Sequence, residues 1–207
     1  ISAKIAAKSN LKTLLVDDKK TLGGSTIFQN NDSFKIDDQH SSKWLEKEIN
    51  EISEIENLTV KTRTSIAAYH GYNYLLAREN LTDHLSIKDK KDKIRQRLWK
   101  IRAKKVIVAT GAIERPLVFN NNDRPGILLS NSINKYLDYY GVACGKNIIL
   151  FTNNDSAYET AISLHKKGIK NLIVDLRKNS QSEIAKQAQN LGIKIYFNHV
   201  VTNTFGY

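Results

Sequence analysis

The segment Lys104–Pro116 constrains the fold of this chain more than any other. Val106–Val108 is an unbroken run of β-branched residues, which is typical of a strand buried on both faces of a parallel sheet. The run ends at Ala109-Thr110-Gly111, whose small side chains leave the backbone accessible. Because open α/β sheets bind ligands beyond the carboxyl ends of their strands, the segment predicts a strand that borders a binding crevice. An ordinary strand and turn is the alternative.

The first residues predict the second half of a nucleotide-binding βαβ unit. Ile1–Ser9 is rich in Ala and predicts a helix, and Leu11–Val16 predicts a short buried strand with Asp17 at its carboxyl end. An acid at this position accepts hydrogen bonds from the adenosine ribose hydroxyls in such units. We therefore expect Asp17 to bind a ribose, and an acid that only stabilises a turn is the alternative.

The Gly-x-Gly-x-x-Gly loop that precedes the helix of such a unit does not occur in this sequence. The chain begins at Ile1, within the expected helix, and contains no Met. We therefore expect the chain to be an internal piece of a longer protein, with the first strand and the glycine loop upstream.

The spacing of apolar residues changes near Leu58. Residues 32–40 predict a polar loop, and helical spacing predicts a helix over Lys43–Ile55 that Ser41 or Ser42 caps. From Leu58 the period is two, which predicts an antiparallel meander on the edge of the parallel sheet, within about residues 58–105. The expected strands are Leu58–Lys61, Ser65–Tyr69, Tyr72–Glu79 and Arg97–Lys105, with an exposed charged connection at 83–93.

We expect residues 1–125 to form a first lobe and residues 126–207 a second α/β lobe. After a helix that begins at Ser130 or Ser132 and ends near Tyr140, strands and helices alternate. The expected elements are strand Asn147–Phe151, helix Ser156–Lys166, strand Asn171–Asp175, helix Ser182–Leu191 and strand Lys194–Asn198.

The turn Thr152–Ala157 in the second lobe contains no glycine. Backbone amides approach a pyrophosphate closely only where no side chain intervenes, and Asp155 would add a negative charge beside it. We expect Asp155 to cap the following helix instead, and the second lobe to bind no dinucleotide of its own.

The formal net charge of +11 on 207 residues raises the question of nucleic-acid binding. Basic residues concentrate in Lys88–Lys105, but from Arg95 onward they alternate with Leu98, Trp99 and Ile101, which predicts a strand with one exposed face. No helix-turn-helix, zinc-finger or RNA-binding motif accompanies the charge, so we expect no nucleic-acid partner.

The remaining composition favours a non-catalytic, cytoplasmic domain. The single cysteine, Cys144, excludes an intrachain disulfide, and no Cys/His cluster has the spacing of metal ligands. No window approaches 18 apolar residues, so we expect no membrane span. The five histidines are scattered without a paired nucleophile or acid, and none is a candidate catalyst.

Three runs together resemble the α subunit of heterotetrameric sarcosine oxidase: Ala109–Phe119, Asn122–Gly126 and Phe151–Tyr158. The Ala-Thr-Gly motif is common among flavoproteins, whereas the other two runs are specific to this subgroup. The resemblance extends over essentially the whole chain. It implies an α/β fold of the glutathione-reductase-like, two-dinucleotide-binding class, with Rossmann-like lobes and a small antiparallel meander.

The resemblance also implies a bacterial complex of α, β, γ and δ subunits that oxidises sarcosine to glycine, reduces oxygen to peroxide and passes the one-carbon unit to tetrahydrofolate. This domain would hold NAD, a C-terminal domain would bind tetrahydrofolate, and FAD and FMN would lie elsewhere in the complex. Asp17 would bind the ribose, Ile66 the adenine, and the acid at the strand end would favour NAD over NADP. The implied cofactor contacts are Asp17, Asp18, Lys19, Gly24, Ser25, Ile66, Thr110 and Gly111.

Two alternatives stay open. The chain could belong to a related amine or opine dehydrogenase, or to a pyridine nucleotide-disulfide oxidoreductase, with FAD in this site. The absence of a Cys-x-x-x-x-Cys pair disfavours the disulfide enzymes. It could also be an assembly module that docks partner subunits and binds no nucleotide.

Overall fold

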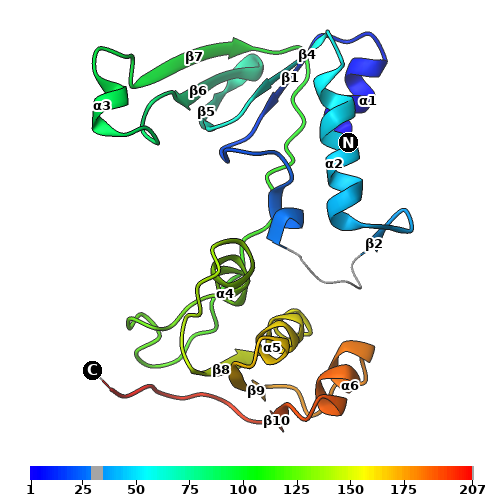
Figure 1. Ribbon diagram of the computed structural model, residues 1–207, viewed down its shortest axis with the longest axis vertical. Coiled ribbons are helices and arrows are strands. Elements are labelled where there is room, and N and C mark those ends of the chain that lie inside the picture. The colour runs from blue at the N-terminus through cyan, green and yellow to red at the C-terminus, as the bar shows by residue number, and fades with distance from the viewer. Residues whose placement is uncertain (29–34, 207) are drawn as a thin grey trace. The chain divides into compact units, whose positions relative to one another are not determined.

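The computed structural model describes residues 1–28 and 35–206, and the chain divides into two compact units (Figure 1). Unit 1 comprises Ile1–Thr26 and Ser33–Gly111, and unit 2 comprises Ile27–Asp32 and Ala112–Tyr207. Among the described residues, no helix is long and apolar enough to cross a membrane.

A parallel strand pair and two helices form the first part of unit 1. Helix α1 (Ser2–Lys8) leads into β1 (Thr13–Val16), which pairs in parallel with β4 (Leu58–Lys61). Between them in sequence, α2 (Ser41–Ser53) lies beside α1, and the Lys4 ammonium donates to Glu48 Oε1 at 2.6 Å (Figure 1). The buried centre of this part consists of Ala7, Ile52 and Leu58. The predicted helix, strand and acid at the start of the chain are thus confirmed.

The region before α2 differs from the expected polar loop. Residues 32–34 lie outside the described residues, but β2 (Lys35–Ile36) and β3 (Gln39–His40) form a short hairpin whose turn residues, Asp37 and Asp38, have φ of 49° and 58°. Asp tolerates this left-handed conformation, which explains how so short a turn forms. His40, rather than Ser41 or Ser42, is the N-cap of α2, and its ring nitrogen accepts from the Ser42 amide at 3.4 Å.

Three of the four strands expected in the antiparallel meander form a sheet in the order β5-β6-β7, whereas the first, Leu58–Lys61, pairs in parallel with β1 instead. The strands of this sheet are β5 (Thr64–His70), β6 (Tyr74–Asn80) and β7 (Gln96–Arg102), with the 3-10 turn η2 (Gly71–Asn73) after β5 and helix α3 (Ile87–Lys90) in the connection from β6 to β7 (Figure 1). The meander is a sheet of its own rather than an extension of the β1–β4 pair. The Thr64 amide, which donates to the Asp17 carbonyl at 2.9 Å, joins the start of β5 to the end of β1.

The predicted strand at Val106–Val108 is wrong. Residues 103–119 contain no helix or strand, and Ile107 and Val108 are 66% and 69% exposed. A strand of a parallel sheet requires hydrogen-bonding neighbours, and among the described residues β1 and β4 pair only with each other. An apolar run without a neighbouring strand cannot bury either face, which explains the extended, exposed segment.

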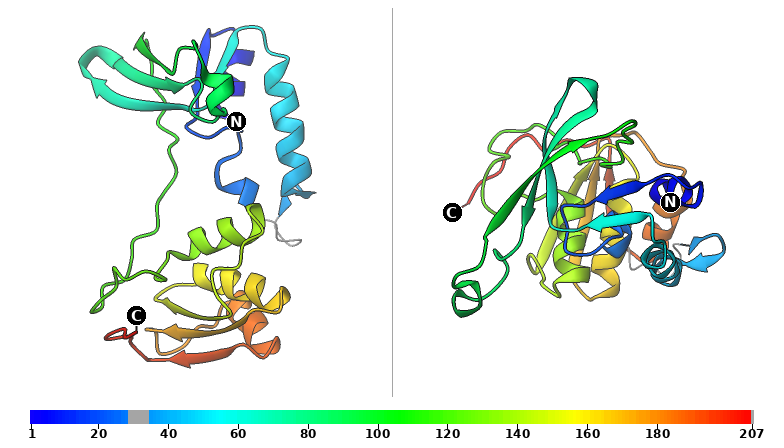
Figure 2. Two further views of the ribbon diagram at one scale, coloured as in Figure 1. Left: turned by 60° about the vertical axis from the view of Figure 1, so that its left-hand side comes forward. Right: turned by 90° about the horizontal axis from the view of Figure 1, so that it is seen from above.

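Unit 2 is an α/β layer with one buried face. Strands β8 (Asn147–Thr152), β9 (Lys170–Asp175) and β10 (Lys194–Phe197) are parallel in the order β10-β9-β8. Helices α5 (Ser156–Lys166) and α6 (Glu183–Asn190) connect them and pack on the sheet (Figure 2). The core includes Leu150, Ile173, Tyr158, Leu164 and Ala188, so the predicted alternation of strands and helices is confirmed.

The helix predicted to end near Tyr140 is divided into two parts. Helix α4 (Ser130–Asn134) continues into a single π-helical turn, η3 (Lys135–Tyr139), and Gly141 follows with φ of +66°. Glycine adopts this left-handed conformation without a steric cost, so it ends the helix where the sequence predicts.

Candidate functional site

Asp17 lies at the carboxyl end of β1 with its backbone held on both sides. Its amide donates to the Lys61 carbonyl at 2.9 Å, and its carbonyl accepts from Thr64 at 2.9 Å. Side-chain Oδ1 accepts from the Lys19 amide at 2.8 Å, whereas Oδ2 has no hydrogen-bond partner among the described residues. The residue is only partly buried. A fixed carboxylate with one oxygen available can accept hydrogen bonds from a ligand hydroxyl.

Asp18 and Lys19 are placed beside this carboxylate. The Lys19 ammonium lies 2.7 Å from Asp18 Oδ2, with both side chains about half exposed, and the Lys19 carbonyl accepts from Arg63 at 2.8 Å. The positive charge nearest to Asp17 in sequence is therefore already paired with a second carboxylate.

The other residues expected at the site are exposed. Gly24 begins the 3-10 turn η1 (Gly24–Phe28) with φ of +55° and open space around the position of a Cβ atom, and Ser25 follows it. Ile66 is 44% exposed on β5, two residues beyond Thr64. Hydrogen bonds thus bring Asp17 together with Lys19 and with the start of β5, the strand that carries Ile66.

Thr110 and Gly111 lie in the extended segment after the meander. Both are exposed, and neither makes a hydrogen bond with another described residue. No hydrogen bond between described residues joins them to Asp17.

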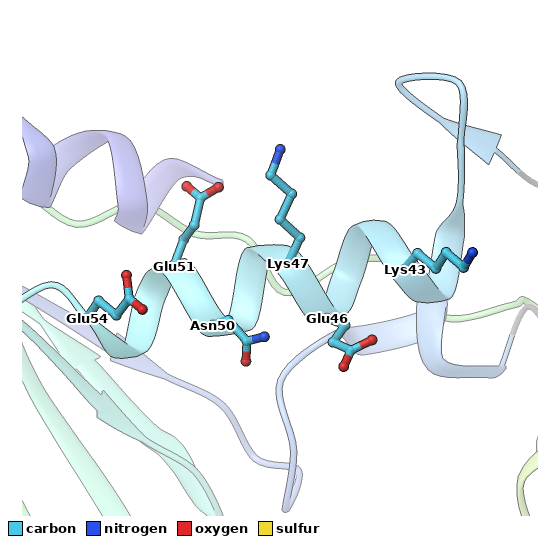
Figure 3. Close-up of a pocket in the computed structure, with 6 residues that line it drawn as sticks. All are labelled: Lys43, Glu46, Lys47, Asn50, Glu51 and Glu54. Carbon is cyan, nitrogen blue, oxygen red and sulfur yellow. The ribbon is translucent and has the colours of Figure 1, made fainter.

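A shallow pocket of about 480 Å³ lies along α2 and is lined by Lys43, Glu46, Lys47, Asn50, Glu51 and Glu54. Figure 3 shows Lys47 and Glu51 on one side of the helix and Glu46 and Asn50 on the other, so the side chains do not converge. Small-molecule sites are predominantly apolar with a few convergent polar groups. This charged helix surface lacks that character.

Unit 2 carries a second acid at the end of a strand, Asp175. Both oxygens of its carboxylate are bound by other residues of unit 2. Asp175 is fully buried. Its Oδ1 accepts from the Arg177 amide at 2.9 Å, and its Oδ2 accepts from the Tyr158 hydroxyl and from Arg177 Nη2, each at 2.7 Å. Arg177 Nη2 also lies 2.7 Å from Asp155 Oδ1. We call Asp155, Tyr158, Asp175 and Arg177 the strand-end cluster of unit 2.

Burial and ion pairing shift the pKa values of the acids in this cluster in opposite directions. Burial disfavours ionisation of Asp175, but hydrogen bonds from Arg177 and Tyr158 outweigh it and hold the pKa of the carboxyl below its usual value. Arg177 likewise lowers the pKa of Asp155. Burial, together with the bond to Asp175, raises the pKa of the Tyr158 hydroxyl. The cluster is therefore one arginine paired with two carboxylates, beside a neutral tyrosine.

The turn Thr152–Ala157 is also closed by its own side chains. Thr152 Oγ1 donates to the Asn154 carbonyl at 2.9 Å, and Asn154 Oδ1 accepts from the Ser156 amide at 2.9 Å and from its hydroxyl at 2.7 Å. Asp155 occupies the N-cap position of α5, but its side chain makes no capping bond. The expected capping role of the Asp155 carboxylate is wrong, because Arg177 and Ser180 bind it instead.

The strand-end cluster was not predicted from the sequence. A signal existed, because Asp-x-Arg at 175–177 repeats the spacing of Asp-x-Lys at 17–19 after a short apolar strand. In both places the first acid accepts a hydrogen bond from the amide two residues later.

Other reactive side chains do not gather into a site. Cys144 is partly buried against the core of unit 2. Among the described residues, no group of three or more His, Cys, Asp or Glu could hold a metal ion.

Comparisons with known proteins identify relatives of this chain. No family model matches the sequence. Sarcosine oxidase subunit alpha from Corynebacterium sp. strain P-1 is 36% identical over 203 residues, which is 98% of this chain and 21% of the relative. The chain is homologous to a segment of sarcosine oxidase subunit alpha. The subunit from Rhizobium meliloti is 34% identical over 168 residues, or 81% of this chain and 17% of the relative. The chain spans about a fifth of the length of these relatives.

Solved structures show the fold. The match to L-proline dehydrogenase from P. horikoshii covers 87% of this chain and 35% of the dehydrogenase chain, with a TM-score of 0.61 and 24% identity. The flavoprotein disulfide reductase RclA from Escherichia coli matches 99% and 48% with a TM-score of 0.62 and 13% identity. An NAD-dependent persulfide reductase from A. fulgidus matches 100% and 38% with a TM-score of 0.62 and 9% identity. The expected glutathione-reductase-like fold class is confirmed.

Proposed function

We propose that this chain is the NAD-binding, non-catalytic part of the α subunit of a sarcosine oxidase, within an oxidoreductase that oxidises sarcosine with oxygen and transfers the one-carbon unit to tetrahydrofolate. One observation carries the assignment of the nucleotide. In a segment homologous to sarcosine oxidase subunit alpha, Asp17 ends a parallel strand and keeps Oδ2 without a partner among the described residues.

The residues present fit the adenosine half of a dinucleotide. A ribose diol needs hydrogen-bond acceptors, and the carboxylate of Asp17 supplies one beyond the bond to the Lys19 amide. Ile66 offers a partly exposed apolar surface on the adjacent strand β5 for an adenine ring. Gly24 and Ser25 are the proposed contacts to the ribose or pyrophosphate, and Thr110 and Gly111 those at the far side of the cofactor.

The charges around Asp17 favour NAD over NADP. A 2′-phosphate would meet the carboxylates of Asp17 and Asp18, and the nearby ammonium of Lys19 is already paired with Asp18 at 2.7 Å. NADP sites instead place an Arg beside the phosphate. Asp18 and Lys19 are therefore assigned to the adenosine end of the site.

The proposal gives this domain a binding role. NAD supplies hydride transfer where it takes part in chemistry. Among the described residues around Asp17, no nucleophile is paired with a base, so no catalytic residue is proposed. FAD, FMN, the folate site and the β, γ and δ subunits belong to the rest of the proposed complex.

The test is to express the full-length protein with its partner subunits, release its nucleotides with acid and identify them by mass spectrometry, while assaying peroxide formed from sarcosine. NAD bound to the α chain together with sarcosine-dependent peroxide is the expected result. FAD in the α chain without a response to sarcosine would instead indicate an amine or opine dehydrogenase. An α chain without any nucleotide would indicate an assembly module.

A further inference from the structure

The two faces of the β6–β7 hairpin differ in how their charges are balanced. Side chains alternate between faces, and the register places Arg78 opposite Leu98, Leu76 opposite Lys100 and Tyr74 opposite Arg102. All six therefore share one face. We call it the basic face, defined by Arg78, Leu98, Lys100 and Arg102. The hairpin that carries it extends to α3 (Figure 1).

On the opposite face, Glu79 neutralises the nearby cations Lys61 of β4 and Arg97 of β7. Glu79 Oε1 lies 3.4 Å from the Lys61 ammonium, and its Oε2 accepts from the Trp99 ring nitrogen at 2.6 Å. Arg97 lies 3.8 Å from the same carboxylate. The Lys61 ammonium also sits 4.1 Å from the centre of the Trp99 ring. This face needs no partner to balance its charge.

The basic face has no such balance. The side chains of Arg78 and Lys100 are exposed and make no hydrogen bond or ion pair with any described residue, and the Arg102 side chain stacks over the Tyr74 ring at 5.4 Å. The positions of this face on β6 and β7 contain no acid. Asp83, beyond the end of β6, is already bound by Arg95 and Gln96.

An apolar side chain lies among these cations. Leu98 is 60% exposed, directly opposite Arg78 and two residues from Lys100. A solvated surface normally mixes charges of both signs, whereas arginines around an apolar contact are typical of protein interfaces. The rings on β6 and β7 are not free for base stacking, because Trp99 lies on the opposite face and Arg102 stacks over Tyr74. The exposed tyrosines of the meander, Tyr69 and Tyr72, lie at the end of β5 and in the turn η2 instead. The composition therefore favours a protein over a nucleic acid.

We propose that the basic face of the meander docks another subunit of the complex, through a surface on which Asp and Glu side chains surround an apolar contact. The identity of the partner as a subunit of the same oxidase rests on the proposed function. Charge complementarity selects the partner, because the face carries three cations and no acid. Leu98 supplies the apolar contact at its centre.

The test uses the full-length chain co-expressed and purified with the other subunits of the complex. The double variant Arg78→Glu, Lys100→Glu reverses the charge, and Leu98→Gln independently removes the apolar contact. The matched control is Lys43→Glu, Lys47→Glu on the exposed surface of α2, which makes the same change in net charge within the same unit. Circular dichroism verifies folding, and subunit affinity is measured by light scattering and by titration.

The charge-reversed variant should weaken subunit affinity at least about tenfold, and Leu98→Gln should weaken it less, while the α2 control stays unchanged. Added salt should weaken the wild type more than the charge-reversed variant. Unchanged affinity in both basic-face variants, or an equal loss in the α2 control, would overturn the proposal. So would binding of a single-stranded RNA oligonucleotide that the charge reversal abolishes while subunit affinity persists.

Nucleotide content is measured on the same samples, which separates the two proposals. Loss of subunit affinity with a full complement of NAD supports the interface and leaves the nucleotide assignment intact. Loss of affinity in a protein that contains no NAD supports the interface and removes the nucleotide assignment.

Discussion

Asp17 in unit 1 and Asp175 in unit 2 occupy the same place in two α/β layers but have different environments. Each lies at the carboxyl end of a strand that follows a helix, Asp17 directly after β1 and Asp175 as the last residue of β9. Each accepts a hydrogen bond from the amide two residues later, at 2.8 and 2.9 Å. The second oxygen of Asp175 is bound by Tyr158 and Arg177, whereas that of Asp17 has no partner among the described residues. The fold supplies a carboxylate at this position, and the neighbouring side chains decide whether a ligand can use it.

The largest expected effect is on the stability of unit 2. Asp175→Asn removes the charge that pairs with Arg177 and binds the buried Tyr158, and breaking a buried pair in this way costs about 3 kcal/mol of unfolding free energy. Urea unfolding followed by circular dichroism measures the loss. The matched variant Asp17→Asn should change stability by less than about 0.5 kcal/mol, because its side chain is partly exposed and receives one hydrogen bond. Equal losses in the two variants would remove the distinction between the two acids.

The reverse difference is expected in nucleotide binding. Asp17→Asn should weaken NAD binding by about tenfold or more, since a hydrogen bond to a charged group contributes about 1.5–3 kcal/mol. Calorimetric titration of the full-length protein with NAD gives the affinity. An affinity equal to that of the wild type would refute the role of Asp17.

The loss of unfolding free energy at low pH should depend on the strand-end cluster. The pKa values of Asp155 and Asp175 are held below their usual values, so the stability they contribute is fully present above the unfolded pKa of about 3.9 and is lost as pH falls through the lower folded pKa. Arg177→Gln should therefore be less stable than the wild type at neutral pH, and the gap should narrow below about pH 4. Thermal unfolding between about pH 3 and pH 7 tests this, and a gap independent of pH would contradict it.

Among the substitutions in the strand-end cluster, Tyr158→Phe is expected to have the smallest effect on stability. The substitution removes one of the three hydrogen bonds to Asp175 Oδ2, while Arg177 still binds the same oxygen through Nε and Nη2. The loss should be about 1 kcal/mol, the usual net value of one hydrogen bond. Unfolding measurements beside Asp175→Asn would reveal it, and a loss as large as that of Asp175→Asn would show that the ion pair contributes little.

Apart from the short β2–β3 hairpin, the sequence predicted those strands and helices whose neighbours lie within the described chain. Leu58–Lys61 and Ser156–Lys166 were predicted with the bounds that the structure shows, because each packs against partners that the same pattern reveals. Val106–Val108 has the composition of a buried strand but has no neighbouring strand, and hydrophobicity alone cannot supply one. Strand propensity therefore indicates that a segment can form a strand, whereas a neighbouring strand to pair with decides whether it does.

The chemistry of the strand ends was predicted only in part. The position of Asp17 follows from the strand that precedes it, and the structure confirms that position. Whether the Asp175 carboxylate can bind a ligand depends on Tyr158, which lies 17 residues earlier on α5, and on the guanidinium of Arg177. Sequence spacing reveals the repeated acid but not which side chains reach it. The same limit explains why Asp155 was expected to cap α5 and binds Arg177 instead.

The most direct test of the central claim is the number of dinucleotides that each full-length chain binds, measured by acid release and chromatography against protein concentration. Because Asp17 keeps an oxygen for a ligand and both oxygens of Asp175 are bound by neighbouring residues, we predict about one NAD per chain. Two dinucleotides per chain would show that the closed turn at 152–157 and the strand-end cluster do not exclude a ligand, and would contradict the distinction between the two units.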